Sequence, residues 1–155
     1  MKLKFAINFF LLVLLFSGGS SAFAEDLAVL EAQKVFKQYV DLERAYDPAQ
    51  AELYAPNASI KDTRLYQDGQ SKTLTWTGDS YKQIIKAQLP VAKSRNEQYS
   101  YQQTSFTHEG NNVRLKCVRV SSTKKYSAPL EIVFAAGPKP GTPWKIVEES
   151  CQSQP

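Results

Sequence analysis

The sequence predicts an α+β domain in which a curved, largely antiparallel sheet wraps around three helices. Residues 27–46 place apolar side chains at helical spacing and contain neither Gly nor Pro, which favours one long helix. From Gln98 onward the pattern is that of β-strands joined by short polar links, as in an antiparallel meander. Within residues 113–122 the apolar phase slips, which indicates a β-bulge, and bulges bend sheets. A curved sheet needs helices to fill its concave side.

The other two helices and the first two strands follow the long helix. The Asp-Pro dipeptide at 47–48 supplies an N-cap and a proline at the first helical position, so a short second helix begins there. Strand patterns occur at 58–65 and 72–78, on either side of the turn-prone sequence QDGQS. A third helix is expected at 79–89, where apolar residues recur at helical spacing before Pro90 ends it.

Four more strands are expected in the second half of the chain. They occupy residues 98–108, 113–122, 126–136 and 144–150. In the second of these, Val113, Leu115 and Cys117 share one parity. Val118 and Val120 take the other parity, so a bulge near Cys117 is the simplest explanation.

The N-terminal segment predicts export. Two lysines precede the apolar run Phe5–Phe16, and Ala22–Ala24 has the A-x-A form of a signal-peptidase site. The run is shorter than the ~20 residues of a membrane-spanning helix, so a cleaved signal peptide is favoured over a retained anchor. We therefore expect a signal peptide at 1–24, a single mature domain at 25–155, and a periplasmic or secreted protein with no stable membrane insertion.

Charge and composition exclude several functional classes. The chain has 19 basic and 15 acidic residues, and removing residues 1–24 with their two lysines lowers the basic count to 17. The resulting net charge of +2, carried by scattered residues, predicts no nucleic-acid partner. His108 is the only histidine, so Cys and His ligands are too few for a zinc site. We expect no metal and no cofactor.

Cys117 and Cys151 leave a disulfide open. An even number of cysteines in a chain bound for an oxidising compartment favours a bond between them. In a regular meander one strand separates the two, however, and two strand spacings are about 9.5 Å, beyond the ~7 Å Cα limit for a disulfide. The bond therefore forms only if Cys151, beyond the last strand, folds back, or if the bulge near Cys117 brings the two cysteines together.

The order of these elements resembles that of the nuclear transport factor 2-like (NTF2-like) superfamily, which includes SnoaL-like and ketosteroid-isomerase-like domains of cystatin-like α+β type. Two phrases carry the resemblance: "YDPAQAELYAPNASIKD" is similar to that superfamily's second helix, stop and first strand, and "WTGDSYKQII" to its glycine and third helix. The resemblance covers residues 30–150 and implies a cone-shaped, antiparallel to mixed sheet around the helices, with a pocket inside. Because the superfamily includes enzymes and domains without assigned activity, the resemblance implies a fold more than a reaction.

Three residues match functional positions of the ketosteroid isomerases within this resemblance. Asp62, on the strand face that it shares with Ala58 and Ile60, stands in the place of the base. Glu131, in "SAPLEIVF", stands in the place of a carboxylic acid, and Tyr39 is the nearest match to a tyrosine of the first helix. If the three share one cavity, Asp62 could abstract a proton alpha to a carbonyl, while Glu131 and Tyr39 donate hydrogen bonds to the developing oxyanion.

The role of Glu131 depends on which face of its strand is buried. Leu130, Ile132 and Phe134 form the more apolar face, and if they pack on the helices, Glu131 points outward and the catalytic arrangement fails. If they instead cover a homodimer interface on the outer face of the sheet, Glu131 and Val133 point into the cone. The dimer and the catalytic arrangement therefore stand or fall together.

These patterns predict a small exported binding or interaction domain. It would hold a small apolar ligand in the cone, or bind an envelope or toxin partner protein at its rim, without catalysis. The alternative is a cofactor-free isomerase or lyase that acts on an enolisable carbonyl compound with Asp62 as base. The residues expected to line the pocket are Tyr39, Tyr54, Ile60, Trp76, Ile85 and Val133.

Overall fold

The computed structural model describes residues 19–139 and 141–154 and has the α+β architecture expected from the sequence. Its elements are α1 (Gly19–Ala45), the 3-10 helix η1 (Pro48–Leu53), β1 (Tyr54–Leu65), β2 (Ser71–Thr77), α2 (Gly78–Ser94), β3 (Tyr99–Glu109), β4 (Asn112–Ser121), β5 (Ser127–Ala135) and β6 (Lys145–Ser153). Most of the expected signal peptide, residues 1–18, lies outside the described residues. In the part of the chain that is described, no helix is long and apolar enough to cross a membrane.

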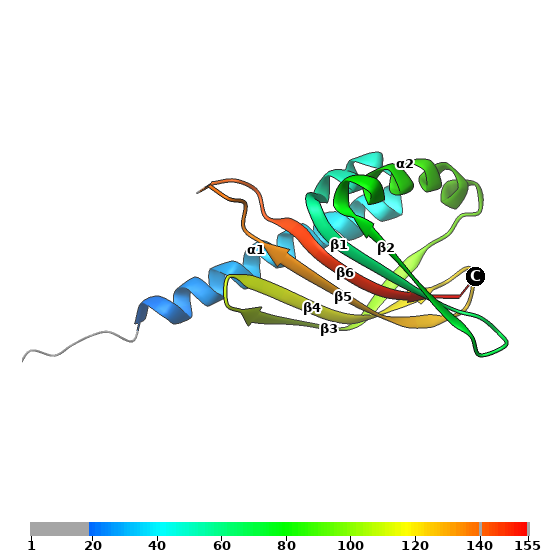
Figure 1. The fold of residues 1–155 in the computed structure, drawn as a ribbon. Helices are drawn as coiled ribbons and strands as arrows, with labels where there is room; N and C mark the ends of the chain where they lie inside the picture. The colour runs from blue at the N-terminus through cyan, green and yellow to red at the C-terminus, as the bar shows by residue number, and fades with distance from the viewer. Residues whose placement is uncertain (1–18, 140, 155) are drawn as a thin grey trace, which may run out of the picture.

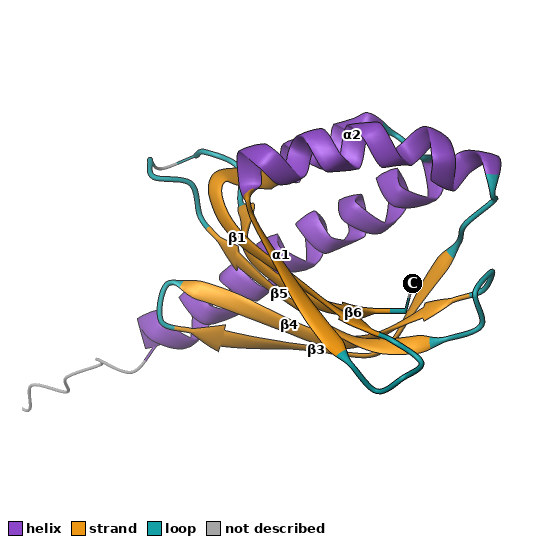
Figure 2. Cartoon of the chain, turned by 45° about the vertical axis from the view of Figure 1, so that its right-hand side comes forward, coloured by secondary structure: helices purple, strands orange, loops and turns teal. Residues whose placement is uncertain are grey.

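The six strands form one mixed sheet in the order β2-β1-β6-β5-β4-β3. Only the β1–β6 pair is parallel, and the other four pairs are antiparallel. The sheet twists strongly, and its strands lie in front of α1 in Figure 1. After a turn of the view, Figure 2 shows α1 and α2 together on one side of the sheet. Side chains on that side of the sheet, its inner face, therefore meet the helices, whereas those on the outer face do not.

Several element boundaries differ from the sequence-based expectation: α1 begins at Gly19 rather than at residue 27, and β6 ends at Ser153 rather than at residue 150. β1 begins at Tyr54, directly after η1, rather than at residue 58. Pro90 does not end α2, which continues to Ser94. A proline removes one backbone N–H donor from a helix, but the following turn is still closed here, because the Arg95 N–H donates to the carbonyl of Val91 at 3.1 Å.

The bulge expected near Cys117 lies in the neighbouring strand instead. β4 pairs with β5 in an unbroken register from Asn112 to Val120. The irregularity falls between Gln102 and Ser105 of β3, where Gln103 has a φ of 53°. Because β4 itself has no bulge, its odd-numbered residues all face inward, and Val118 and Val120 belong to the outer face.

A second irregularity turns a carboxylate into the interior. In the β5–β6 pair Val133 is opposite Glu148 and Phe134 is opposite Ile146, so Val147 is an extra residue on β6. An extra residue reverses the alternation of side chains beyond it. Ile146 and Glu149 are consequently both buried, although they are an odd number of residues apart.

The core fills the space between the helices and the inner face of the sheet. Its fully buried members include Ile60 of β1, Leu115 of β4 and Phe134 of β5. The start of α2 approaches β1 so closely that a Cβ atom at Gly78 would lie 1.8 Å from the carbonyl oxygen of Ala55. Gly78 is therefore the residue that lets the helix pack directly against the strand.

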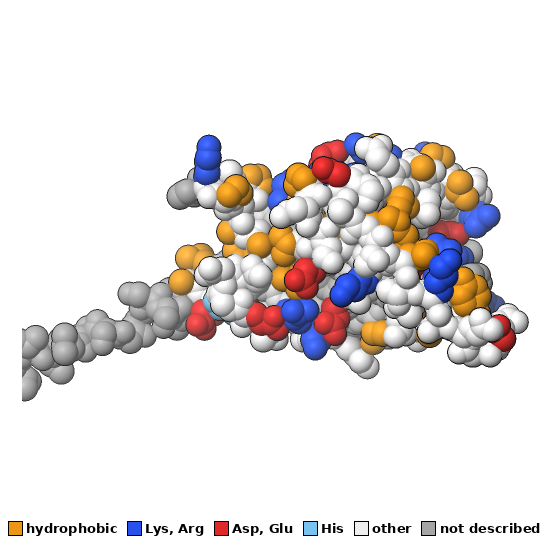
Figure 3. Space-filling view, in the orientation of Figure 1, with side chains coloured by type: hydrophobic (Ala, Val, Ile, Leu, Met, Phe, Trp, Pro, Cys, Tyr) orange, Lys and Arg blue, Asp and Glu red, His pale blue; other side chains and the backbone are white. Residues whose placement is uncertain are grey.

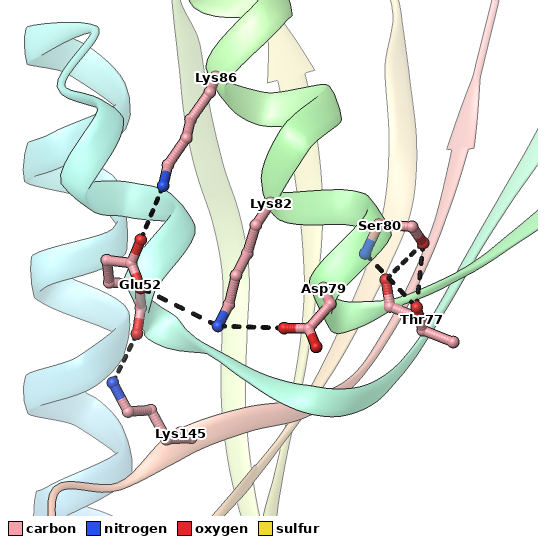
Figure 4. A network of polar contacts seen from close by, with 7 residues as sticks. All are labelled: Glu52, Thr77, Asp79, Ser80, Lys82, Lys86 and Lys145. Carbon is pink, nitrogen blue, oxygen red and sulfur yellow. Dashed lines mark hydrogen bonds and ion pairs between the residues drawn. The ribbon is translucent and has the colours of Figure 1, made fainter.

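Glu52 ties η1 to α2 and to the start of β6, as Figure 4 shows. Its carboxylate accepts a hydrogen bond from Lys86 at 2.9 Å and lies 3.9 Å from the ammonium of Lys82, while Lys145 donates to its backbone carbonyl. The Thr77 side chain caps the N-terminus of α2 through the Ser80 N–H. Because the Glu52 side chain is 59% exposed, its ion pairs position the elements more than they stabilise them.

Candidate functional site

A cavity of about 120 Å³ lies between α1, η1 and α2 on one side and the sheet on the other. Five tyrosines line it: Tyr39, Tyr46, Tyr54, Tyr81 and Tyr99. Apolar side chains of α2 complete part of the wall, and these are Ile85, Leu89 and Ala92. Three charged residues also reach the cavity, and these are Glu43, Glu97 and Arg119. The lining is therefore a mixture of aromatic, apolar and charged groups, typical of small-molecule sites.

An ion pair between α1 and β4 forms one wall of the cavity. Arg119 Nη2 lies 2.7 Å from Glu43 Oε1, and the two side chains are 23% and 12% exposed. The second oxygen of Glu43 accepts a hydrogen bond from the Tyr101 hydroxyl at 2.5 Å. The guanidinium also stacks on the ring of Tyr99, with Cζ 3.7 Å from the ring centroid. Nearby Glu43 raises the pKa of Arg119 well above its ordinary value despite burial, so this cation stays charged.

A second buried carboxyl, Glu149 of β6, lies behind the tyrosines. It is 2% exposed. Tyr54 donates a hydrogen bond to one of its oxygens at 2.5 Å, and Tyr81 to the other at 3.4 Å. Burial raises the pKa of Glu149 above its ordinary value, although the hydrogen bond from Tyr54 acts in the opposite direction. Burial and the Glu149 charge likewise raise the pKa of Tyr54 and Tyr81 well above the ordinary value, so both hydroxyls remain donors.

The six residues expected to line the pocket take three different places. Tyr39, Tyr54 and Ile85 line the cavity. Ile60 is a fully buried core residue, and Trp76 packs on the ring of Tyr81, with centroids 5.8 Å apart. Val133 lies on the outer face, one position from the core residues of β5. The prediction that Val133 lines the pocket is therefore wrong. It required the odd-numbered residues of β5 to face inward, whereas the even-numbered residues Leu130, Ile132 and Phe134 do so.

Asp62 does face inward, on the same side of β1 as the buried Ala58 and Ile60. Ser153 donates to both of its oxygens, at 2.8 and 3.1 Å, and Arg64 Nε lies 3.4 Å away. Its side chain is 16% exposed. The carboxylate is thus held by the ends of β1 and β6 and is absent from the lining of the cavity described above.

Glu131 points the other way, and the expected arrangement of Asp62, Glu131 and Tyr39 is not formed. Its carboxylate lies 3.3 Å from Arg114 and 3.5 Å from Lys116, and its side chain is 41% exposed. The reason is that Leu130, Ile132 and Phe134 are fully buried and belong to the same core cluster as residues of α1. The argument for a homodimer required these three residues to face outward, so it loses its basis.

The two cysteines are free thiols. Cys117 of β4 and Cys151 of β6 are both paired with Leu130 of β5, one on each side, so a whole strand separates them. Burial raises the pKa of Cys117 to about 11 and raises that of Cys151 further. Among the described residues, no group of three or more His, Cys, Asp or Glu side chains could hold a metal ion.

The sequence analysis missed four charged residues, namely Glu43, Glu97, Arg119 and Glu149. Arg119 has the same parity as Val113, Leu115 and Cys117, so a strand without a bulge predicts it inside. The assumed bulge concealed that signal. Glu149 carries no local signal, because its inward orientation depends on the extra residue in β6.

Comparison with known proteins supports the fold but assigns the chain to no sequence family. No protein-family model matches the chain, and no curated protein sequence matches it. Solved structures do match. An NTF2-like protein of unknown function from Pseudomonas putida KT2440 superposes with a TM-score of 0.66 and 10% identity, over 83% of this chain and 87% of that one. The chain has the NTF2-like fold.

Other structures with this fold give the same result. An NTF2-like protein with a cystatin-like fold from Novosphingobium aromaticivorans has a TM-score of 0.59 and 15% identity, over 88% of this chain and 90% of that one. A protein from Parabacteroides distasonis, provisionally described as a ketosteroid isomerase, has a TM-score of 0.55 and 15% identity, over 78% and 83%. At these identities the NTF2-like likeness concerns architecture, and the function must be argued from the site.

Proposed function

We propose that this chain is an exported small-molecule-binding domain that does not catalyse a reaction. The observation that carries the proposal is the cavity of about 120 Å³ lined by tyrosines and charged side chains. It is smaller than the 300–1,000 Å³ typical of sites for drug-sized ligands, so the ligand would be small. The separation of Asp62 from Glu131 and Tyr39 supports binding over the isomerase arrangement expected from the sequence.

The ligand in this proposal is polar rather than apolar. The sequence suggested an apolar pocket, but Glu43, Glu97 and Arg119 reach the cavity along with hydroxyls and rings of tyrosines. An apolar molecule would leave such groups without hydrogen-bond partners, which is costly in a partly closed site.

The test is to fill the cavity and measure ligand retention. Ala92 lines the cavity from α2, so Ala92→Leu should occupy part of it, whereas exposed Ala87 on the same helix does not line it. We expect native mass spectrometry of the purified wild type and Ala87→Leu to show a co-purified small molecule, which Ala92→Leu loses. Thermal-shift screening with small polar compounds checks the same contrast. Equal behaviour of the two variants would contradict the proposal.

A second candidate function is proton transfer on an enolisable carbonyl compound. The observation that favours it is the buried Glu149, whose pKa burial raises and whose oxygens accept hydrogen bonds from Tyr54 and Tyr81. Glu149 does not line the cavity itself, so in this version Tyr54 or Tyr81, which do line it, takes the substrate proton on its oxygen and passes its own hydroxyl proton to Glu149. Turnover of a small ketone, measured as deuterium exchange at the alpha carbon, should then be lost in Glu149→Gln and retained in Asp62→Asn. Absence of exchange in the wild type with a range of ketones would remove this candidate.

Export and partner binding are the remaining parts of the proposal. The sequence of the first 24 residues supports export. Intact mass of the protein recovered from the periplasm or medium should correspond to a chain that begins at Glu25, whereas a full-length cytoplasmic product would refute cleavage. A protein partner at the rim is the alternative to a small ligand, and co-purification of a protein with both Ala92→Leu and the wild type would favour it.

A further inference from the structure

One charged group at the cavity, Glu97, is largely but not fully buried and has only weak partners. Its side chain is 13% exposed. Tyr99 is the nearer partner, with its hydroxyl 3.5 Å from Oε2, and Arg95 Nη1 lies 3.7 Å from Oε1. Good hydrogen bonds to oxygen fall between about 2.5 and 3.2 Å, so both contacts are long. Arg95 is 64% exposed and therefore contributes little to a screened pair. The carboxylate is placed to accept a closer donor.

The cation on the same wall, Arg119, is also incompletely bonded. A guanidinium has five N–H groups, and the structure gives Arg119 one side-chain hydrogen bond, from Nη2 to Glu43. Its Nε is buried and has no hydrogen-bond partner among the described residues. Burying a donor without a partner is unfavourable, which makes an acceptor at this guanidinium advantageous.

Tyr99 lies between these two groups and sets their separation. Arg119 stacks on the face of its ring, and Glu97 lies at its hydroxyl end. Within the described residues, Glu97 and Arg119 form no ion pair with each other. Both line the same cavity. The site therefore offers an acceptor for a cation at the hydroxyl end of Tyr99 and a donor for an anion over the face of its ring.

We propose that the cavity binds a small zwitterion, with its ammonium group at Glu97 and its carboxylate at Arg119. This inference rests on the proposed binding function and names its ligand class. The cavity of about 120 Å³ fits a molecule of a few non-hydrogen atoms, and Ile85, Leu89 and Ala92 supply apolar surface for its methylene groups. Because a zwitterion has zero net charge, its binding leaves the net charge of Glu43, Arg119 and Glu97 unchanged in the largely enclosed site.

The experiment uses three probes of similar size. β-Alanine carries both charges, propylamine carries only the positive charge, and propionate carries only the negative charge. Isothermal titration calorimetry at low salt should show β-alanine binding about tenfold or more tightly than either single-charge probe. Glycine and 4-aminobutanoate measure the preferred charge separation. Equal affinity for the zwitterion and for either single-charge probe would overturn the inference.

The variants assign the two charges to their residues. Glu97→Gln should reduce β-alanine affinity to that of propionate, while Arg119→Lys, which keeps the charge but loses the forked donors, should weaken β-alanine and propionate alike. Glu52→Gln is the control, because Glu52 is an exposed carboxylate outside the cavity. An unchanged affinity in Glu97→Gln would overturn the assignment. If the zwitterions fail but a neutral compound binds in a manner sensitive to Ala92→Leu, only the ligand class is wrong; if nothing binds, the proposed function fails as well.

Discussion

The two faces of the same sheet use charged residues in opposite ways. On the outer face, Arg114, Lys116 and Glu131 form ion pairs across β4 and β5, with side chains that are 27%, 61% and 41% exposed. Figure 3 shows acidic and basic side chains next to one another over this part of the molecule. Water solvates each of these groups, so each pair contributes little to stability.

On the inner face the same residue types are enclosed. Arg119 and Glu43 are 23% and 12% exposed, and Glu149 is 2% exposed. There, each charged side chain is stabilised by specific partners, Arg119 by Glu43 and Glu149 by Tyr54 and Tyr81. Removing one partner leaves the remaining group buried without a hydrogen bond or counter-charge. In this protein, therefore, the face of the strand decides more than the residue type whether a charged side chain affects stability or the candidate site. The variants below test that contrast.

Removing the buried cation should have the largest effect. Arg119→Met keeps much of the side-chain volume but leaves Glu43 buried without its cation, and we expect the free energy of unfolding to fall by about 3 kcal/mol. Lys116→Met, on the outer face of the same strand, should cost less than about 0.5 kcal/mol. Urea denaturation followed by fluorescence measures both. Adding Glu43→Gln to Arg119→Met should restore part of the loss, and equal losses in the two single variants would contradict the contrast.

The orientation of these faces could be predicted wherever a strand is regular. In β1 the alternation of Ala58, Ile60 and Asp62 is unbroken, so period-two reasoning places Asp62 on the inner face, where the structure has it. The helices and most strands could also be predicted, because their signals are local patterns of apolar residues and caps. The long N-terminal helix and the six strands follow from such patterns.

Orientation could not be predicted where it depends on a bulge. Glu149 points inward because Val147 is an extra residue of β6 opposite β5. The bulge predicted for β4 lies in its partner β3, because the sequence does not show which of two paired strands carries the extra residue. Bulges are properties of paired strands, so the pairing must be known first. Arg119 and Glu149 were missed for this reason, whereas Tyr39, Tyr54 and Ile85 of the same region could be predicted. Glu43, on α1, and Glu97, in the loop before β3, depend on no bulge.

The hydrogen bond from Tyr54 to Glu149 should be the next largest contribution. Tyr54→Phe removes the donor and leaves an oxygen of a buried carboxyl without a partner, so the free energy of unfolding should fall by about 2 kcal/mol. The loss should also raise the pKa of Glu149 further, because this hydrogen bond lowers it. Tyr66→Phe, in the hairpin between β1 and β2 where Tyr66 is 39% exposed, is the matched control and should have no measurable effect. A similar cost at both positions would argue against a buried Glu149.

Glu149 should also give the protein a specific pH dependence. Because burial raises its pKa in the folded state, the folded protein binds more protons than the unfolded chain between the unfolded value, about 4.3, and the raised value. Its contribution to stability is therefore fully present below the unfolded pKa and is lost as pH rises through the folded pKa. Glu149→Gln should remove this decline, so the difference in unfolding free energy between variant and wild type should grow with pH in that window and then level off. A difference independent of pH would show that Glu149 ionises as it does in the unfolded chain.

A substitution on the outer face should have the smallest effect. It also tests whether Glu131 lies on the solvated outer face or inside the cone. Glu131→Gln weakens the pairs with Arg114 and Lys116, which are partly solvated, so the free energy of unfolding should change by less than about 0.5 kcal/mol and the change should vanish at high salt. Because Glu131 lies outside the cavity, β-alanine affinity should be unchanged in this variant. Chemical denaturation at two salt concentrations and calorimetry on one preparation measure both quantities. A large loss of ligand affinity would place Glu131 inside the cone after all, since a solvated carboxylate on the far side of the sheet has no direct contact with a bound molecule.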